Sequence, residues 1–198
     1  MKSILDARFW NGWHGLYRIE ALERLRRLKD DADALAAEFT ALRDRIGPPA
    51  STIEVVSSAR QTLAIDSMLV HLISCMSVEA FLNHYGVARL GEAFYKRNCE
   101  RCTASQKVAL LLLATSGKQL DENAELLVIV HRLFSRRNAF VHPKAIAAAL
   151  PLMGTVPNAA SWSDHRVPFS AERSVADMNR FFELFVAVDP SAARLSLG

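Results

Sequence analysis

The sequence lacks the residues and patterns that several protein classes require. Three cysteines among 198 residues, an odd number, argue against a disulfide framework and fit a reducing cytoplasm. No segment shows a convincing strand pattern. The longest uninterrupted aliphatic run, 108–114, is too short to cross a bilayer, and the first twenty residues have neither a continuous apolar stretch nor a small-residue cleavage site. We therefore expect a cytoplasmic protein with no signal peptide and no membrane contact.

The familiar motifs of several enzyme classes are missing as well. There is no Gly-rich phosphate loop, no Gly-x-Ser-x-Gly elbow and no His-Glu-x-x-His sequence. The Cys-x-x-Cys at 99–102 has no second pair at metal-ligand spacing, which favours reduced thiols over a zinc site. We expect neither a metal nor a cofactor. The net charge is only +3, so a site for a polyanion has to come from local clustering of cations.

What the sequence has in abundance is helical periodicity. From about Leu16 to Ile46, apolar residues recur with a heptad rhythm and charges fill the other faces, which predicts a long amphipathic helix that packs on a helix of the same chain or of a second copy. Gly-Pro-Pro at 47–49 ends it. Capping boxes at Ser51–Glu54 and Thr103–Gln106 predict a helix over about 52–85, ending near Gly86, and a short helix that Gly117 closes. Asp121 would cap a helix that runs to about Val141, and a last helix is expected over 171–188, after a long loop at 151–169. These patterns predict an all-α, up-and-down helical bundle. Residues 1–50 would form an aromatic segment and the heptad helix, and residues 51–198 the bundle, packed together as one unit.

An arginine interrupts the apolar face of the helix expected at 121–141. At spacings of 4, 3, 4 and 3 residues, one stripe contains Leu126, Val130, Leu133, Arg137 and Phe140. Removing a guanidinium from water costs roughly several kcal/mol unless hydrogen-bond or ion-pair partners compensate for it. Arg137 must therefore face a carboxylate, a cleft at a helix interface or an anionic ligand. An internal ion pair is one solution, and Asp66 offers its carboxylate from the apolar face of the 52–85 helix, in line with His84.

An anionic ligand is the other solution, and it accounts for more of the neighbourhood. His142 directly precedes Pro143, which biases its backbone away from helix, and Asn138 lies four residues before His142 and can hydrogen-bond its ring. No Asp or Glu occurs from 126 to 163. Four cations are consequently unopposed along the chain: Arg132, Arg136, Arg137 and Lys144. A cation cluster with a base of near-neutral pKa suits a phosphate-bearing ligand. The favourable macrodipole at a helix C-terminus also explains Arg136 and Lys144, but not the central Arg137.

The segment Arg-Asn-Ala-Phe-Val-His at 137–142 resembles the Arg-x4-His signature of HEPN domains, including the polar residue after the arginine. Residues 77–86 resemble the Glu-x-Phe-x-Asn pattern on an earlier core helix of several HEPN branches, and residues 104–120 stand where those branches place a short helix. The resemblance covers roughly residues 52–190.

This resemblance implies a metal-independent endoribonuclease that acts as a homodimer, with two motifs meeting at one cleft. His142 would be the general acid or base, Arg137 would bind the scissile phosphate, and Asn138 would orient the histidine. Glu79 matches the family segment but lies off the apolar stripe, so it is a secondary candidate beside Asp66 and His84.

Such proteins include toxins held by an antitoxin protein and phage-defence effectors. The alternative is a non-catalytic HEPN-type module that dimerises and binds a nucleotide or a partner protein, with Arg137 as a structural ion-pair residue.

Overall fold

The computed structural model describes residues 13–46, 52–141 and 166–196. Within these ranges the chain is helical and contains no strand, which confirms the all-α fold class. The elements are α2 (Trp13–Ile46), α3 (Thr52–Leu90), α4 (Glu92–Asn98), α5 (Ala104–Ser116), α6 (Glu125–Val141), α7 (Arg166–Val188), η3 (Pro190–Ala192) and α8 (Ala193–Ser196). The expected stop at 47–49, the cap at Ser51 and the loop at 151–165 lie outside the described residues.

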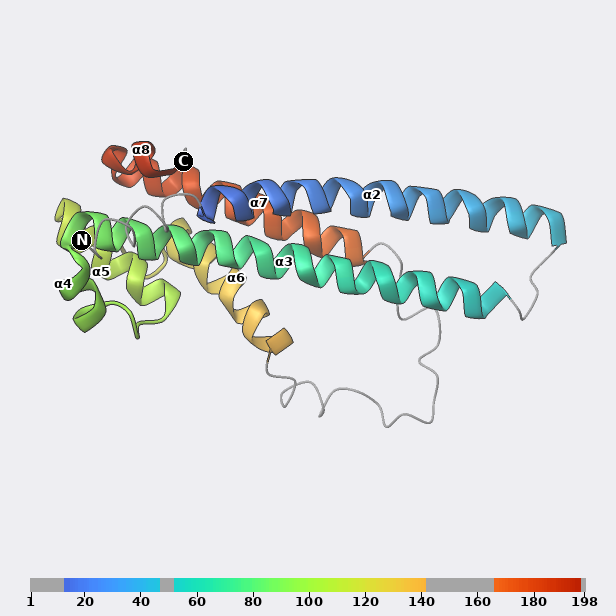
Figure 1. Ribbon diagram of the computed structural model, residues 1–198, viewed down its shortest axis with the longest axis horizontal. Coiled ribbons are helices and arrows are strands. Elements are labelled where there is room, and N and C mark those ends of the chain that lie inside the picture. The colour runs from blue at the N-terminus through green and yellow to red at the C-terminus, as the bar shows by residue number, and fades with distance from the viewer. Residues whose placement is uncertain (1–12, 47–51, 142–165, 197–198) are drawn as a thin grey trace, which may run out of the picture.

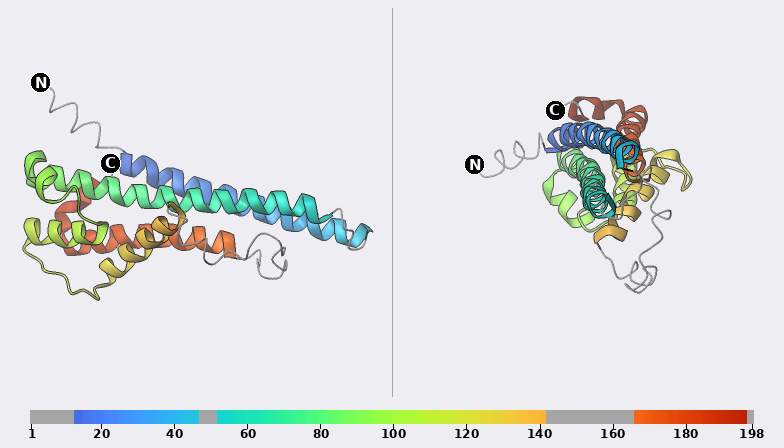
Figure 2. Two further views of the ribbon diagram at one scale, coloured as in Figure 1. Left: turned by 90° about the horizontal axis from the view of Figure 1, so that it is seen from below. Right: turned by 90° about the vertical axis from the view of Figure 1, so that its right-hand side faces the viewer.

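The two longest helices, α2 and α3, form an antiparallel hairpin that sets the length of the molecule (Figure 1). Helix α7 packs against both, α6 packs against α3 and α7, and α4 and α5 gather at the end of α3 far from the 47–51 connection. The α2–α3 hairpin extends beyond α6 and α7 in the left view of Figure 2. One end of the molecule is therefore a multi-helix bundle, and the other is a two-helix projection.

Helix α2 follows the heptad pattern and packs on α3 of the same chain. Ala21 and Leu28 are buried in the common core, whereas Phe39, farther along the same seam, is 43% exposed. The seam of a two-helix hairpin has no third helix to cover it, so burial decreases along α2 as the bundle ends. The N-terminal helix thus shares one core with the rest of the chain.

Helix α3 does not end near Gly86, and this corrects the expectation from sequence. It continues to Leu90, and Gly91, which follows the helix, has a positive φ of 81°. A Cβ at Gly86 would lie 2.4 Å from the ring of Tyr95, which belongs to α4. Gly86 is a point of close helix approach, not a helix stop. It lets the α4 aromatic ring lie directly against the α3 backbone.

The capping box of α5 is confirmed. The side chain of Thr103 accepts a hydrogen bond from the Gln106 backbone N–H, the Gln106 side chain accepts one from the Thr103 N–H, and Gly117 closes the helix in the left-handed region (φ 68°). Asp121 does not cap α6, which begins three residues later than such a cap predicts. The Asp121 carboxylate accepts from the Asn123 N–H in a local turn, and α6 begins at Glu125.

At the C-terminal end, α7 begins at Arg166, five residues before the expected start, so the last part of the expected 151–169 loop is helical. The helices α4, η3 and α8 were not expected from the sequence. Asp189 caps η3 by accepting from the Ser191 N–H, and its carboxylate also accepts from the Tyr85 hydroxyl of α3. These contacts fasten the end of the chain to the bundle.

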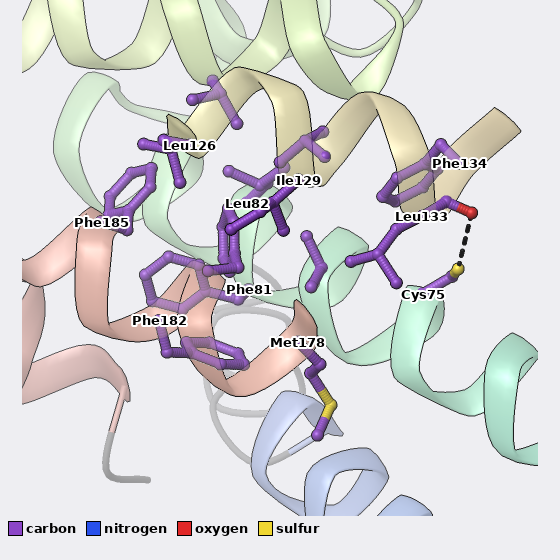
Figure 3. Close-up of a cluster of buried hydrophobic side chains, with 14 of the residues drawn as sticks. Cys75, Phe81, Leu82, Leu126, Ile129, Leu133, Phe134, Met178, Phe182 and Phe185 are labelled. Atoms are coloured by element: carbon purple, nitrogen blue, oxygen red, sulfur yellow. Dashed lines mark hydrogen bonds between the residues drawn. The ribbon is translucent and has the colours of Figure 1, made fainter. Parts of the chain in front are cut away.

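An aromatic cluster forms the centre of the bundle (Figure 3). Phe81 of α3 makes edge-to-face contacts with three rings of α7, at centroid distances of 5.1 to 5.9 Å: Phe181, Phe182 and Phe185. Edge-to-face rings add attraction to the burial of apolar area. Leu126, Ile129 and Leu133 bring α6 onto the same cluster. The stripe that leads to Arg137 is thus core-facing up to Leu133.

By length and composition alone, the Gln61–Leu90 part of α3 could cross a membrane, although no uninterrupted aliphatic run suggests it. The other helices bury 56% of its most apolar window. The central helix of a bundle has the same composition, because it is covered on most sides. The apolar character of this helix is therefore accounted for by the core.

Candidate functional site

Arg137 lies in the last turn of α6 and faces α3. Its Nη1 donates to Oε2 of Glu79 at 2.9 Å, and its Nε and Nη2 make longer bonds, 3.4 and 3.3 Å, to Oδ1 of the adjacent Asn138. The guanidinium carbon lies 4.8 Å from the centroid of the Phe134 ring, one turn back on α6. The side chain of Arg137 is 32% exposed, so one side of the guanidinium is covered and the other reaches solvent.

The acid that faces Arg137 is Glu79, not Asp66. The two carboxylates are thirteen residues apart on one helix, which is roughly 20 Å along its axis. Helix α6 reaches α3 near Glu79, which supplies the carboxylate that pairs with the arginine. A helical wheel gives the direction of a side chain but not the height at which the neighbouring helix crosses. This is why Asp66 was the wrong partner.

A buried lysine shares Glu79 with Arg137. Lys107 of α5 is 4% exposed, and its Nζ lies 3.9 Å from Oε1 of Glu79 and donates to Oδ1 of Asn83 at 3.0 Å. The Tyr95 hydroxyl donates to the same oxygen of Asn83, and burial raises the pKa of Tyr95 far above its usual range. Four helices, α3 to α6, therefore meet in one polar cluster.

Three members of that cluster, Lys107, Asn83 and Tyr95, were not singled out from the sequence. The signal for Lys107 is its place beside the aliphatic run at 108–114, on the same buried face of α5 as Val108 and Leu111. Asn83 is the last residue of the Glu-x-Phe-x-Asn pattern, in which Glu79 and Asn83 share the cluster and Phe81 points into the aromatic core. One turn of α3 separates the two polar residues of the pattern, so both face the same side.

Arg132 is not an unopposed cation in the folded chain. Its Nε donates to Oδ2 of Asp177 at 2.7 Å and its Nη2 donates to the other oxygen, which makes a two-pronged pair between α6 and α7. The hydrogen bond to Asp177 raises the pKa of Arg132. The Asp177 side chain is 6% exposed, and Arg173 approaches it at 3.8 Å. The acid-free interval predicted open cations, but α7 supplies the missing carboxylate.

A shallow groove of about 540 Å³ runs beside this pair, between α6 and α7. Its cations are Arg132, Arg173 and Arg180, and its acids are Glu125 and Asp177. Arg180 pairs with Glu125 at 2.9 Å, so each carboxylate of the groove already holds an arginine. Arg137 does not line this groove.

Arg136 turns toward the core. Its Nη1 is buried and has no hydrogen-bond partner among the described residues. Burial, and next the charge of Arg136, lower the pKa of His71 to about 4. His71 is a hydrogen-bonded core histidine, since its Nδ1 lies 2.7 Å from Oγ of Ser174. Burial also raises the pKa of the neighbouring Cys75 to about 12, so its thiol is not a nucleophile.

His84 lies apart from Arg137. It is buried, and its ring stacks on that of His14 from α2 with centroids 6.0 Å apart; burial lowers the pKa of both histidines. Five residues after Glu79, it points about 140° away around α3. His84 therefore belongs to the contact between α2 and α3.

His142 and Lys144 lie outside the described residues, directly after the end of α6 at Val141. Among the residues that the structure describes, no three His, Cys, Asp or Glu side chains gather as a metal site. Cys99 is buried, and Cys102 is half-buried and free. The part of the candidate site that can be described is thus Arg137 and Asn138 with Glu79, Lys107 and Asn83 behind them.

Comparisons of the chain with protein-family models, with curated proteins and with solved structures find no match. The resemblance to HEPN domains consequently stays a prediction that rests on the quoted motifs. The site has to be judged from its own geometry.

Proposed function

We propose that this chain is a HEPN-like, metal-independent endoribonuclease of the cytoplasm whose site is the C-terminal end of α6. It would act as a homodimer that brings two copies of the 137–142 motif to one RNA strand. A toxin or phage-defence effector, with or without an antitoxin partner, is the biological role that fits such an activity.

The observation that carries this proposal is the incomplete pairing of Arg137. A guanidinium has five N–H donors in a rigid fork. One donates to Glu79 at 2.9 Å, the bonds to Asn138 are long, and about a third of the side chain is exposed. Asn138 is itself exposed. The guanidinium of Arg137 therefore retains N–H donors for a phosphate that approaches from solvent. Arg137 is also only five residues before His142 in the sequence.

The chemistry needs no metal, because RNA carries its own nucleophile. The 2′-oxygen attacks phosphorus while a base takes the 2′-OH proton, the bond to the 5′-oxygen breaks, and an acid gives that oxygen a proton. The imidazole of His142 could serve as the base or the acid, because histidine ordinarily titrates near neutral pH. General acid–base catalysis of this kind typically accelerates a reaction by about 10²–10⁴-fold. Arg137 stabilises the charge that develops on the phosphoryl oxygens. The Asn138 amide nitrogen is a donor that can orient the histidine.

Incubation of the purified protein with total RNA in EDTA tests the proposal. We expect cleavage by the parent protein and none by Arg137→Ala or His142→Ala. Arg26→Ala is the matched control, since Arg26 is an exposed cation of α2 that pairs with Glu23 and Asp30. No cleavage by the parent, or equal cleavage by all four proteins, rejects the ribonuclease.

The second candidate is a non-catalytic module that dimerises and binds a nucleotide or a partner protein. The observation that favours it is the ion pair between Arg137 and Glu79, which joins α6 to α3 and gives the arginine a structural task. In that case Arg137→Ala lowers stability without any RNA phenotype. Expression separates the two candidates: a parent protein that stops growth, beside a tolerated His142→Ala form, supports the enzyme.

A further inference from the structure

Lys107 is a buried charge that the proposed chemistry does not use. Its ammonium is held inside the bundle by Oδ1 of Asn83 at 3.0 Å, by Glu79 at 3.9 Å and by the face of the Tyr95 ring at 5.9 Å. Only 4% of the residue is exposed. An ammonium in such surroundings is costly, and an apolar side chain at this position would fill the same space. The charge therefore calls for an explanation beyond packing.

Glu79 is the link between this lysine and the candidate site. Its Oε2 accepts from Arg137 at 2.9 Å, and its Oε1 faces Lys107. Two cations and one carboxylate leave the cluster with one net positive charge. Lys107 cannot present that charge to solvent, whereas the Arg137 side chain is 32% exposed. The net positive charge of the cluster is consequently accessible to a ligand at Arg137.

We infer that Lys107 is a positioning residue that neutralises Glu79 from the buried side, so that Arg137 keeps its charge for one phosphodiester group. The inference rests on the proposed function and deepens it, because it says how Arg137 remains available beside a carboxylate. A phosphodiester carries a single negative charge at neutral pH, and its arrival brings the cluster to zero. Without Lys107, Glu79 alone would balance Arg137 before any ligand arrived.

Lys107→Met tests the inference, since methionine keeps the unbranched side chain and removes the charge. Affinity for inorganic phosphate and for a short single-stranded RNA should fall about fivefold, the scale of one partly screened charge nearby. The melting temperature should stay equal or rise. Lys96→Met is the matched control. Lys96 is an exposed cation of α4, paired with Glu92, and its loss should leave both affinities unchanged.

Glu79→Gln is the reciprocal variant, which raises the net charge of the cluster by one. Phosphate should bind it more tightly than the parent, even though the buried lysine loses its acid and stability falls. A merely structural role for Lys107 cannot produce opposite shifts in phosphate affinity from the two exchanges. If Lys107→Met does not fold, Lys107→Gln, which also removes the charge, decides in its place: weaker phosphate binding supports the inference, and parent-like binding overturns it.

The outcomes separate this inference from the nuclease. A folded Lys107→Met that binds phosphate and RNA like the parent, while Arg137→Ala loses both, overturns the role of Lys107 and leaves the nuclease standing. Absence of RNA cleavage by the parent in EDTA, together with the opposite shifts in phosphate affinity, rejects the nuclease and supports the anion site. A parent protein that binds neither phosphate nor RNA rejects both.

Discussion

Arg132 and Arg137 lie five residues apart on α6, and their surroundings differ in how completely each cation is matched. Arg132 faces α7 and binds both oxygens of Asp177, whose side chain is 6% exposed. Arg137 faces α3 and makes one short bond to Glu79, whose side chain is 40% exposed and also faces Lys107. The two arginine side chains are about equally exposed, 30% and 32%, so the difference lies in the carboxylates: Asp177 is buried and held at both oxygens, which makes a closed pair, whereas Glu79 is exposed and shared, which makes an open one.

Equal charges on one helix can therefore have different tasks. A guanidinium that holds a buried carboxylate at both oxygens is committed to the fold, because releasing it would strand an anion in the interior. A guanidinium whose carboxylate partner is exposed and also faces a second cation can exchange part of that ion pair for a ligand at little cost in free energy. If this distinction is correct, replacement by alanine must destabilise the protein far more at Arg132 than at Arg137.

The largest effect is expected at the closed pair. Arg132→Ala leaves the buried Asp177 with only the more distant Arg173, at 3.8 Å, and should destabilise the protein by roughly 2–4 kcal/mol. Urea unfolding followed by circular dichroism measures it. Arg180→Ala is the control, because Arg180 pairs with the exposed Glu125, and its loss should cost much less than the loss of Arg132. Equal losses for the two variants would remove the distinction between closed and open pairs.

The next largest effect is a loss of protein stability in acid, and it originates at His71. Burial and the charge of Arg136 lower the pKa of His71 to about 4 in the folded chain, from about 6.5 when unfolded. Between these values the unfolded chain binds more protons, so stability falls as pH decreases from 6.5 toward 4, by roughly 3 kcal/mol for this residue.

Measurement of the unfolding free energy across this pH window, for the parent and for His71→Asn, checks that prediction. Asparagine can keep the hydrogen bond to Ser174, which uses Nδ1 of His71, but does not titrate. The variant should lose less stability in acid than the parent does. His14 and His84, whose pKa values burial also lowers, contribute to the slope that remains. Parallel pH curves for the two proteins would exclude His71 as the source.

A third variant disturbs the Arg137 side alone. In Gly86→Ala the new Cβ would lie 2.4 Å from the Tyr95 ring, so the ring must move. Its hydroxyl, which donates a hydrogen bond to Asn83, moves with it. Such overpacking costs roughly 1–3 kcal/mol. RNA cleavage should fall along with stability, while the Arg132 pair stays intact. Gly91→Ala is the contrasting control, since nothing lies within 4 Å of its Cβ and its cost comes only from the positive φ of 81°. Normal cleavage by Gly86→Ala would show that the α4 contact does not support the site.

The fold class and the helix order were accessible from sequence because period and caps are local. The Thr103 capping box and the Gly117 stop depend on neighbours within a few residues, and both are confirmed. Gly86 misled because its reason is Tyr95, nine residues away and on another helix. The pairing of Arg137 misled in the same way, since only the crossing height of α6 and α3 selects Glu79 over Asp66.

The charge of the candidate site was less accessible still. An acid-free interval in sequence indicated open cations, but Asp177 lies 45 residues from Arg132 and Glu79 lies 58 residues from Arg137. Local sequence thus identifies which side chains carry charge. It does not tell which charges remain unmatched after folding, because that depends on helices brought together by the core.

The smallest effect on stability is expected at the open pair. Arg137→Ala should change the free energy of unfolding by about 1 kcal/mol or less, because the pair is partly exposed and Glu79 keeps Lys107 as a counter-charge. Under the proposed function the same variant loses RNA cleavage completely. Urea unfolding and the EDTA cleavage assay on one preparation provide both values. A loss of several kcal/mol would show that the fold depends on Arg137 as it does on Arg132. Arg137 would then not be available to bind a phosphate, and the proposed site would be rejected.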